Sequence, residues 1–251
     1  MSKNFIITND NVKEYAEKIE NWIKNKIDET GTEGVVLGMS GGVDCSTVAM
    51  LCKNAGIKLH LVILPYGEHM KNSNTYSNAM ELINTSNFEY HIFDIKPAVD
   101  ALIIPTEEKS YRIELARANI RPRIRMTYLY EYAQINNLLV IGTGNLSEAT
   151  VGYFTKWGDG AHDINPLANL TKREVYILAK YLGVPKAIIN AKPSADLWPG
   201  QTDEDELGLT YEQIDEFILN GTSGDNKIDE IIQTKKDRNT HKLEPISKFE
   251  D

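Results

Sequence analysis

One stretch decides the fold of this chain: Gly34-Val35-Val36-Leu37-Gly38-Met39-Ser40-Gly41-Gly42-Val43-Asp44-Cys45-Ser46. Within it, a short apolar run ends in a turn of small residues, and a helical pattern follows at once. This order is typical of a strand–turn–helix unit that binds phosphate, because glycines let backbone N–H groups and a helix N-terminus approach an anion closely. The sequence therefore predicts that the turn holds the phosphate groups of a ligand.

Apolar runs of strand length recur at residues 34–39, 59–64, 90–95 and 138–141. Amphipathic helix patterns alternate with them, over residues 9–29, from Val43 to near Gly56, and over about 75–85. Near-continuous apolar strands that alternate with helices are typical of a parallel sheet with both faces covered. We therefore expect an α/β fold, a three-layer doubly wound parallel sheet with helices on both faces.

The second half of the chain mixes helix patterns with long irregular stretches. Helix patterns lie at 97–104, from Pro122 in a first turn to Asn136, from the Thr171 cap to Leu182, at 211–219 and at 227–236. Glu174 completes a capping box with Thr171. Residues 152–168 and 193–206 read as loops, and the acidic run 203–206 is predicted to be a solvated helix start. Loops this long inside a domain are usually functional.

Length and charge limit the function further. The chain has 251 residues and a formal net charge of -9, which fits one domain over residues 1–251 and argues against nucleic-acid binding. No apolar run is long enough to span a membrane, and the polar start lacks a signal peptide. Cys45 and Cys52 would lie roughly 10 Å apart on one helix, beyond disulfide reach. We therefore expect a cytoplasmic protein with no membrane or nucleic-acid partner.

The turn after the first strand has its own chemistry. No lysine follows its glycines, so it is not a Walker A loop, and the third glycine of a dinucleotide fingerprint is missing. Asp44 instead stands beside the predicted phosphate site. Because a carboxylate repels phosphate unless a cation lies between them, Asp44 predicts a bound Mg²⁺.

Ser40-Gly41-Gly42-Val43-Asp44 resembles the pyrophosphate loop (PP-loop) of the ATP pyrophosphatase superfamily. Four further stretches, at 119–126, 142–148, 152–160 and 193–198, are similar to the ammonia-dependent NAD synthetase family. The resemblance runs in order from the first helix to His241-Lys242 and implies an adenine nucleotide alpha hydrolase-like fold. It implies a ligase that amidates nicotinic acid adenine dinucleotide (deamido-NAD) with ammonia and ATP, through an adenylated nicotinate, giving NAD, AMP and pyrophosphate. It also implies a homodimer and no added glutamine amidase domain.

The resemblance assigns residues to ATP and to the metal. Phosphate binding falls to the turn, and Thr143, Lys172 and Ser194 resemble further ATP contacts; the turn residues are Gly38, Met39, Ser40, Gly41, Gly42, Val43, Asp44 and Cys45. Asp44 and Glu148 would share Mg²⁺. Lys172 follows the Thr171 cap, where its charge opposes the helix dipole, and a bound anion would explain that placement.

A second set of residues matches the family positions that bind deamido-NAD: Arg123, Lys156, Asp163, His241 and Lys242. The substrate carries its own pyrophosphate, so arginine and lysine are the expected partners. Asp163 would also orient the nicotinate or the ammonia, which gives it a catalytic role beside Asp44 and Lys172. Arg121 and Arg125 can share one helix face, but Arg123 is the preferred phosphate ligand.

Two departures from the family pattern stand out. Cys45 replaces the usual serine after the turn aspartate, and a thiol is a weaker hydrogen-bond donor than a hydroxyl. Pro122 replaces a small residue before Arg123. Two alternatives stay open: another PP-loop enzyme, GMP-forming or tRNA-modifying, and a non-catalytic adenine-nucleotide-binding protein. The stretch 155–160 argues against the first, and the pairing of Asp44 with Glu148 argues against the second.

Overall fold

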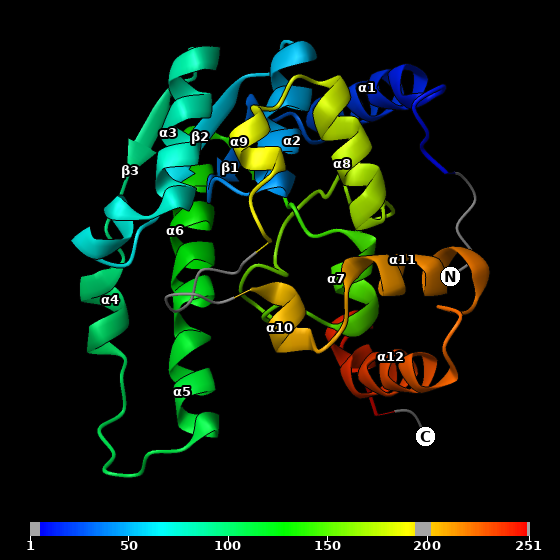
Figure 1. Cartoon of the computed structure of the whole chain (residues 1–251). Coiled ribbons are helices and arrows are strands. Elements are labelled where there is room, and N and C mark those ends of the chain that lie inside the picture. Colours follow the sequence, from blue (N-terminus) through cyan, green and yellow to red (C-terminus); the bar gives the residue numbers. More distant parts are fainter. Residues whose placement is uncertain (1–5, 194–201, 250–251) are drawn as a thin grey trace.

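The computed structural model of the chain describes residues 6–193 and 202–249 (Figure 1). The strands are β1 (Gly34–Gly38), β2 (Leu59–Ile63), β3 (Tyr90–Ile92) and β4 (Leu138–Val140). The first helices are α1 (Val12–Thr30), α2 (Val43–Asn54), η1 (Glu68–Asn72), α3 (Asn74–Ser86), α4 (Lys96–Ala101), α5 (Tyr111–Ala118) and α6 (Ile120–Asn136). The later ones are α7 (Leu146–Val151), α8 (Lys172–Tyr181), α9 (Lys186–Ile189), α10 (Asp203–Leu207), α11 (Tyr211–Asn220), α12 (Asn226–Asn239) and η2 (Thr240–Lys242).

The four strands form one parallel sheet in the order β3-β2-β1-β4. In the register of the sheet, Val36 lies between His60 of β2 and Val140 of β4. The chain leaves β1 through α2 towards β2 on one side, and it returns later to place β4 on the other side. Such a reversal opens a crevice at the carboxyl ends of the two central strands, where ligands of open α/β sheets bind.

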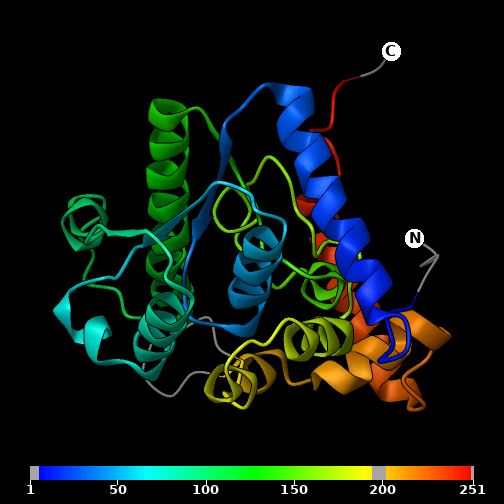
Figure 2. The ribbon, with the colours of Figure 1, turned by 90° about the horizontal axis from the view of Figure 1, so that it is seen from above.

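Both faces of the sheet are covered, so the three-layer prediction is confirmed. Side chains alternate along β1: Val35 and Leu37 pack with α1, α2, α3 and α8, whereas Val36 packs with α4 and α6. Figure 2 shows the sheet edge-on between α6 (green) and the blue helices α1 and α2. All of these strand side chains are fully buried, as expected for a parallel sheet.

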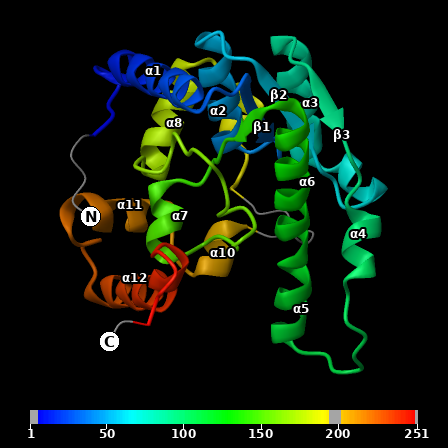
Figure 3. The same cartoon turned by 180° about the vertical axis from the view of Figure 1, so that it is seen from behind.

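The last helices form a smaller cluster around α7, visible from behind in Figure 3. Val151 of α7 packs there against Ile214 of α11 and Ile232 of α12. This cluster lies next to α8 and holds α7 and α11 at the carboxyl end of the sheet. The C-terminal third of the chain therefore builds one wall of the crevice.

The sequence predicted the long elements correctly and missed the short ones. Pro122 lies in the first turn of α6 as expected, and Cys45 and Cys52 are both free and buried. β3 ends at Ile92, three residues earlier than expected. Helices α7 and α9, with six and four residues, were not predicted, because they are too short to show a helical period, whereas the helix start expected at the acidic run 203–206 is present as α10. Among the described residues, no helix is long and apolar enough to cross a membrane.

The predicted capping box at the start of α8 is present, and its glutamate also binds the backbone of a distant segment. Glu174 accepts hydrogen bonds from the Thr171 backbone N–H at 2.8 Å and from its hydroxyl at 2.7 Å. Its other carboxylate oxygen accepts from the backbone N–H of Ile7 at 2.7 Å, which ties the chain before α1 to α8. Glu174 is 1% exposed, so these bonds are shielded from water.

We predict that Glu174→Ala destabilises the protein, because it leaves buried N–H donors without a partner. The free energy of unfolding should fall by about 1–3 kcal/mol. For a chain of this size, each kcal/mol lowers Tm by about 2–4 °C. Thermal unfolding followed by circular dichroism measures the change. Glu17→Ala, on the exposed face of α1, is the control and should leave Tm unaltered; equal losses in both variants would contradict the prediction.

Candidate active site

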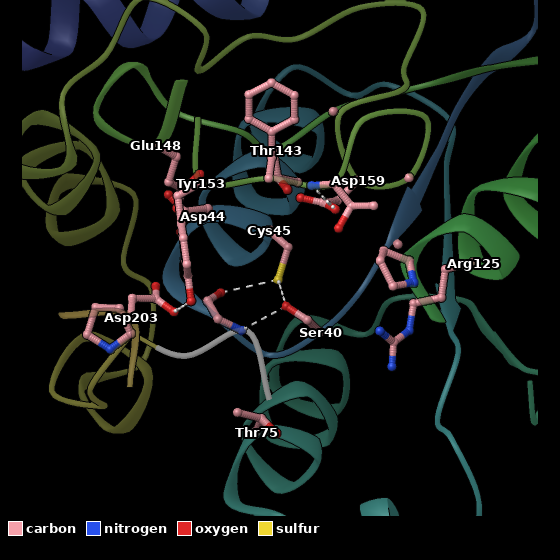
Figure 4. Close-up of a pocket in the computed structure, with 18 of the residues that line it drawn as sticks. Ser40, Asp44, Cys45, Thr75, Arg125, Thr143, Glu148, Tyr153, Asp159 and Asp203 are labelled. Carbon is pink, nitrogen blue, oxygen red and sulfur yellow. Dashed lines mark hydrogen bonds between the residues drawn. The ribbon is translucent and has the colours of Figure 1, made fainter. Parts of the chain in front are cut away.

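The turn between β1 and α2 is built from its own side chains as well as its backbone. Ser40 Oγ accepts a hydrogen bond from the Gly42 N–H at 3.3 Å and lies 3.3 Å from Cys45 Sγ. The Cys45 thiol donates to the Gly42 carbonyl at 3.2 Å, and the Ser46 hydroxyl donates to the same oxygen at 2.7 Å. Cys45 therefore helps to hold the turn in its closed form (Figure 4).

Gly41 is the residue that no side chain can replace in this turn. Its φ is 90°, in the left-handed region that favours glycine. A Cβ at Gly41 would lie 1.9 Å from the carbonyl oxygen of Thr75, in α3. The turn is therefore packed directly against the start of α3, and a side chain at Gly41 would push the two apart.

Three charged side chains converge beside the turn. Lys172, at the start of α8, donates from Nζ to Asp44 Oδ2 at 2.6 Å and to Glu148 Oε1 at 3.4 Å. The Lys172 side chain is 3% exposed, and those of Asp44 and Glu148 are each 18% exposed. Asp44 Oδ1 also accepts from Asn145 Nδ2 at 3.0 Å. The sequence predicted that Asp44 and Glu148 would meet and assigned Lys172 to the ATP phosphates, and the structure brings the three side chains together.

The pKa values of this group reflect burial and pairing. Burial raises the pKa of Glu148 to about 7, and Asp44 adds to that rise while Lys172 opposes it. Burial alone would lower the pKa of Lys172, but the Asp44 and Glu148 carboxylates outweigh it and raise that pKa above its usual value. Lys172 therefore stays protonated, and the two carboxylates offset its unfavourable place at a helix N-terminus.

Glu148 is fixed by the short helix α7. Asn145 caps this helix by accepting from the Glu148 N–H at 3.0 Å, and Glu148 Oε2 accepts from the Asn145 N–H at 3.2 Å. One Glu148 oxygen thus completes a capping box while the other faces Lys172. The same residue, Asn145, orients both carboxylates, because its side chain also donates to Asp44.

The donor set suits magnesium. Mg²⁺ in nucleotide enzymes is usually held by one or two carboxylates, with phosphate oxygens and water completing its shell. Asp44 and Glu148 supply two such carboxylates on opposite sides of one ammonium group. Among the described residues, no group of three or more His, Cys, Asp or Glu side chains could hold a metal without a ligand's help. The fit is therefore to a cation that arrives with phosphate.

A cavity of about 660 Å³ lies over the turn, between the carboxyl ends of β1 and β4 and the start of α8. The described residues assigned to ATP line it, as does Glu148, assigned to the metal; the ATP residues are the whole turn from Gly38 to Cys45, Thr143 and Lys172. Lys242, assigned to the second substrate, also lines it. Figure 4 shows Asp44, Glu148 and Thr143 around the turn and Arg125 on the far side. Ser194 lies outside the described residues.

The remaining positions assigned to the second substrate meet at one corner, outside the described lining of the cavity. Arg123 is exposed on α6, and its Nε donates to the Lys156 carbonyl at 3.3 Å. Lys156 Nζ donates in turn to the His241 carbonyl. Lys242 Nζ donates to the carbonyls of Gly152 and Phe154. The segment 152–156 and η2 are thus joined by two lysines: Lys156 donates to a backbone carbonyl of η2, and Lys242 of η2 donates to backbone carbonyls of the segment.

Asp163 has a different setting. Its Oδ2 accepts from the Val140 backbone N–H at 2.7 Å, and its Oδ1 accepts from the Tyr130 hydroxyl at 3.2 Å. These bonds join the segment after β4 to the sheet and to α6. The assignment of Asp163 to substrate binding stays a prediction. Its hydrogen bond to Val140 shows that it also helps to hold β4 in place.

Several residues of the cavity were not predicted. Asp203 and Glu206, from the acidic run, line it together with Tyr153, and Asp203 is only 5% exposed. The expectation of a merely solvated helix start was therefore wrong for Asp203, because the hydroxyls of Tyr153 and Tyr211 donate to its carboxylate. Arg125 also lines the cavity, whereas Arg123, preferred from the sequence, does not.

The chain matches one known family over almost its whole length. The family model of NAD synthase matches residues 15–249. The NH(3)-dependent NAD(+) synthetase of Finegoldia magna is 40% identical over 241 residues, covering 96% of this chain and 97% of that protein. The enzyme of the same name from Archaeoglobus fulgidus is 39% identical and covers 96% of this chain and 99% of its own.

Solved structures with the same fold include two of comparable size. The NMN synthetase of Francisella tularensis superimposes with a TM-score of 0.86 at 42% identity, covering 94% of this chain and 98% of that one. The NH3-dependent NAD synthetase of Campylobacter jejuni superimposes with a TM-score of 0.77 at 33% identity, covering 95% and 99%. These neighbours confirm the predicted PP-loop fold.

We predict that Gly41→Ala abolishes ATP binding while Gly56→Ala does not. Both glycines have positive φ, 90° at Gly41 and 66° at Gly56, so both variants carry backbone strain of roughly 1–2 kcal/mol. At Gly56, however, nothing lies within 4 Å of the added Cβ, whereas at Gly41 it meets the Thr75 carbonyl. Calorimetric titration with ATP and Mg²⁺ measures the difference. Equal affinities in the two variants would show that the turn does not hold phosphate in this conformation.

Proposed function

The chain belongs to the NAD synthase family, and on that premise we propose that it amidates deamido-NAD with ammonia, consuming ATP and releasing NAD, AMP and pyrophosphate. It is a ligase that forms a C–N bond. The observation that carries this conclusion is the Lys172 ammonium held between Asp44 and Glu148 beside a glycine turn at the end of β1. That arrangement can bind a polyphosphate through the ammonium group and the turn, and its metal ion through the carboxylates, as ATP cleavage between the α and β phosphates requires.

In the first step, a nicotinate carboxylate oxygen attacks the α phosphorus of ATP. The bond from that phosphorus to the bridging oxygen breaks, and pyrophosphate leaves with the electron pair. Lys172 and the N–H groups of the turn face the phosphate oxygens on which negative charge develops. A bound Mg²⁺, held by Asp44 and Glu148, would supply further neutralisation of the phosphate charge.

In the second step, the nitrogen of ammonia attacks the carboxyl carbon of the adenylate. The carbon–oxygen bond breaks, AMP leaves, and the nitrogen loses its extra proton to give the amide. Neither step needs a nucleophile from the protein, so holding the two reacting groups in place accounts for much of the catalysis. The cavity of about 660 Å³ offers one space, partly open to solvent, in which the triphosphate and the nicotinate can meet.

The roles of individual residues and the metal are part of this proposal. ATP is assigned to the cavity, and deamido-NAD to the corner formed by Arg123, Lys156, His241 and Lys242, with Asp163 nearby. Three of these side chains are cationic and are linked through backbone carbonyls. That corner can accept a pyrophosphate if the lysines exchange a carbonyl for a phosphate oxygen, because charge-assisted hydrogen bonds are stronger than neutral ones.

Assembly and location also belong to the proposal. Exposed apolar side chains lie after α4, on α5 and on α6: Leu102, Ile104, Tyr111 and Ile135. A homodimer would cover such surface, since exposed apolar patches of this kind often mark protein interfaces. The two buried, unbridged cysteines support a reducing, cytoplasmic setting.

A second candidate reaction differs only in the acid substrate. The Francisella tularensis relative, at 42% identity, is named an NMN synthetase. A mononucleotide acid presents the same nicotinate, ribose and first phosphate and lacks the adenylate half. Of the residues described above, only those at the outer corner, Arg123 and Lys156 among them, would lose a ligand in that case.

We predict that the protein, ATP, Mg²⁺ and ammonium convert deamido-NAD to NAD with release of AMP, measured by chromatography. The kcat/KM for nicotinic acid mononucleotide should be lower, because the corner cations then have no second phosphate. Arg123→Ala should raise KM for deamido-NAD and leave KM for the mononucleotide unaltered. A higher kcat/KM for the mononucleotide would support the second candidate, and no amide from either acid would refute the proposed function.

We predict that Asp44→Asn removes most of the activity, because it takes away a magnesium ligand and a partner of Lys172. The loss should exceed about 100-fold, the upper end for residues one shell further out from a metal. Steady-state rates at increasing Mg²⁺ measure it, and high Mg²⁺ should restore part of the activity. Asp10→Asn, at an exposed turn before α1, is the matched control. An Asp44→Asn rate equal to the control would refute the metal assignment.

A further inference from the structure

Tyr211, the first residue of α11, contacts the charged group beside the phosphate turn without lining the cavity. The centre of its ring lies 4.8 Å from Lys172 Nζ, within the range of a cation–π interaction. Its hydroxyl donates to Asp203 Oδ2 at 2.9 Å and to Glu148 Oε1 at 3.4 Å. One side chain that is 6% exposed therefore meets both the lysine and the carboxylate of the candidate site.

The helix that carries Tyr211 is fixed by a second buried residue. Asp215 lies one turn further along α11 on the same face and is 1% exposed. Its carboxylate accepts from the Ser147 hydroxyl of α7 and from the Arg173 N–H at 2.8 Å. Ser147 Oγ also accepts from the Lys172 N–H at 2.9 Å. Helix α11 is thereby bonded to the starts of α7 and α8, the two helices that present Glu148 and Lys172.

The hydroxyl end of Tyr211 is fixed by Asp203. This aspartate begins α10, and its other carboxylate oxygen accepts from the Tyr153 hydroxyl at 3.2 Å. Burial raises the pKa of Asp203, while hydrogen bonds from Tyr211 and Tyr153 act against that rise. The Asp203 carboxylate thus has a donor on each oxygen, and the Tyr211 ring has a defined orientation at both ends.

We propose that Tyr211, oriented by Asp203, is a positioning residue that sets where the Lys172 ammonium and the Glu148 carboxylate lie for ATP. This inference rests on the proposed function. Lysine has a flexible four-carbon stem and three rotatable donors, so its buried head needs fixed partners to hold one place. Asp44 and Glu148 provide two partners for the Lys172 ammonium, and the face of the Tyr211 ring provides the third.

Packing alone does not explain why a tyrosine stands at position 211. An apolar residue at this buried position would leave the buried Asp203 Oδ2 without the hydrogen bond that Tyr211 donates to it. A tyrosine is useful there because its hydroxyl end reaches Glu148 while its ring face lies against an ammonium. Tyr211 therefore restrains Lys172 and Glu148, the residues assigned to ATP and its metal. The contacts described above for Tyr211 do not include Arg123 or Lys156 of the outer corner.

The test compares two affinities in Tyr211→Phe, which keeps the ring and removes the hydroxyl. Affinity for the α,β-methylene analogue of ATP with Mg²⁺, measured by calorimetry, should fall by roughly 10–100-fold, as for other residues that orient metal-site ligands. The KM for ATP should rise, and the KM for deamido-NAD should stay as in the native protein. A purely structural role would lower both affinities together, in step with Tm, and would overturn the proposal.

A second variant tests the part assigned to Asp203. Asp203→Asn should weaken binding of the ATP analogue in the same direction, and the double variant should be no worse than Tyr211→Phe alone, because both act through one hydroxyl. Additive losses would refute this coupling. Tyr181→Phe, on the exposed end of α8, is the control and should match the native protein. If the native protein makes no amide, the proposed function fails; if it does and Tyr211→Phe binds the analogue normally, only this inference fails.

Discussion

The structure depends on one buried charge, the ammonium of Lys172. A lysine that is 2% exposed cannot remain charged without partners, and here it has Asp44 and Glu148. Removing one partner of a buried ion pair typically costs about 3–5 kcal/mol, because the other charge is left uncompensated. The three residues come from α2, α7 and α8, so the pairing fixes the start of each of these helices relative to the others.

The sheet explains why these starts meet. Strands β1 and β4 are parallel neighbours, so the segments that follow them emerge at the same edge. The chain leaves β1 through a turn of glycines and leaves β4 through Gly142, Thr143 and Gly144, and each exit leads to a helix start. Small residues at both exits keep the edge open, since a Cβ at Gly142 would lie 2.5 Å from the His162 ring. The topology therefore supplies the crevice, and the helix starts supply the donors and charges around it.

The sequence could place those site residues that stand next to a local pattern, such as a strand end or a helix cap. Asp44, Glu148 and Lys172 each stand next to a strand end or a helix cap, so local patterns place them at one edge. Tyr211 reaches the site only because α11 packs onto α7 and α8, and Asp203 is bonded to it at the start of α10. An acidic run in the sequence carries no sign of that arrangement. The choice of Arg123 over Arg125 shows the same limit. Both lie on α6, but only the packing of that helix against β1 and β4 decides which of them faces the cavity.

The charge balance of the group also suits it to the proposed reaction. Lys172 pairs with both carboxylates, and burial together with the nearby Asp44 raises the pKa of Glu148 to about 7. When a cation and phosphate enter together, the cation can pair with the carboxylates, and the ammonium can turn to a phosphate oxygen. Every charge then keeps a partner of opposite sign, and the helix starts need not move. The lysine that pairs with both carboxylates is therefore already in place to neutralise the phosphate, and this preorganisation is what makes fixed charges effective in catalysis.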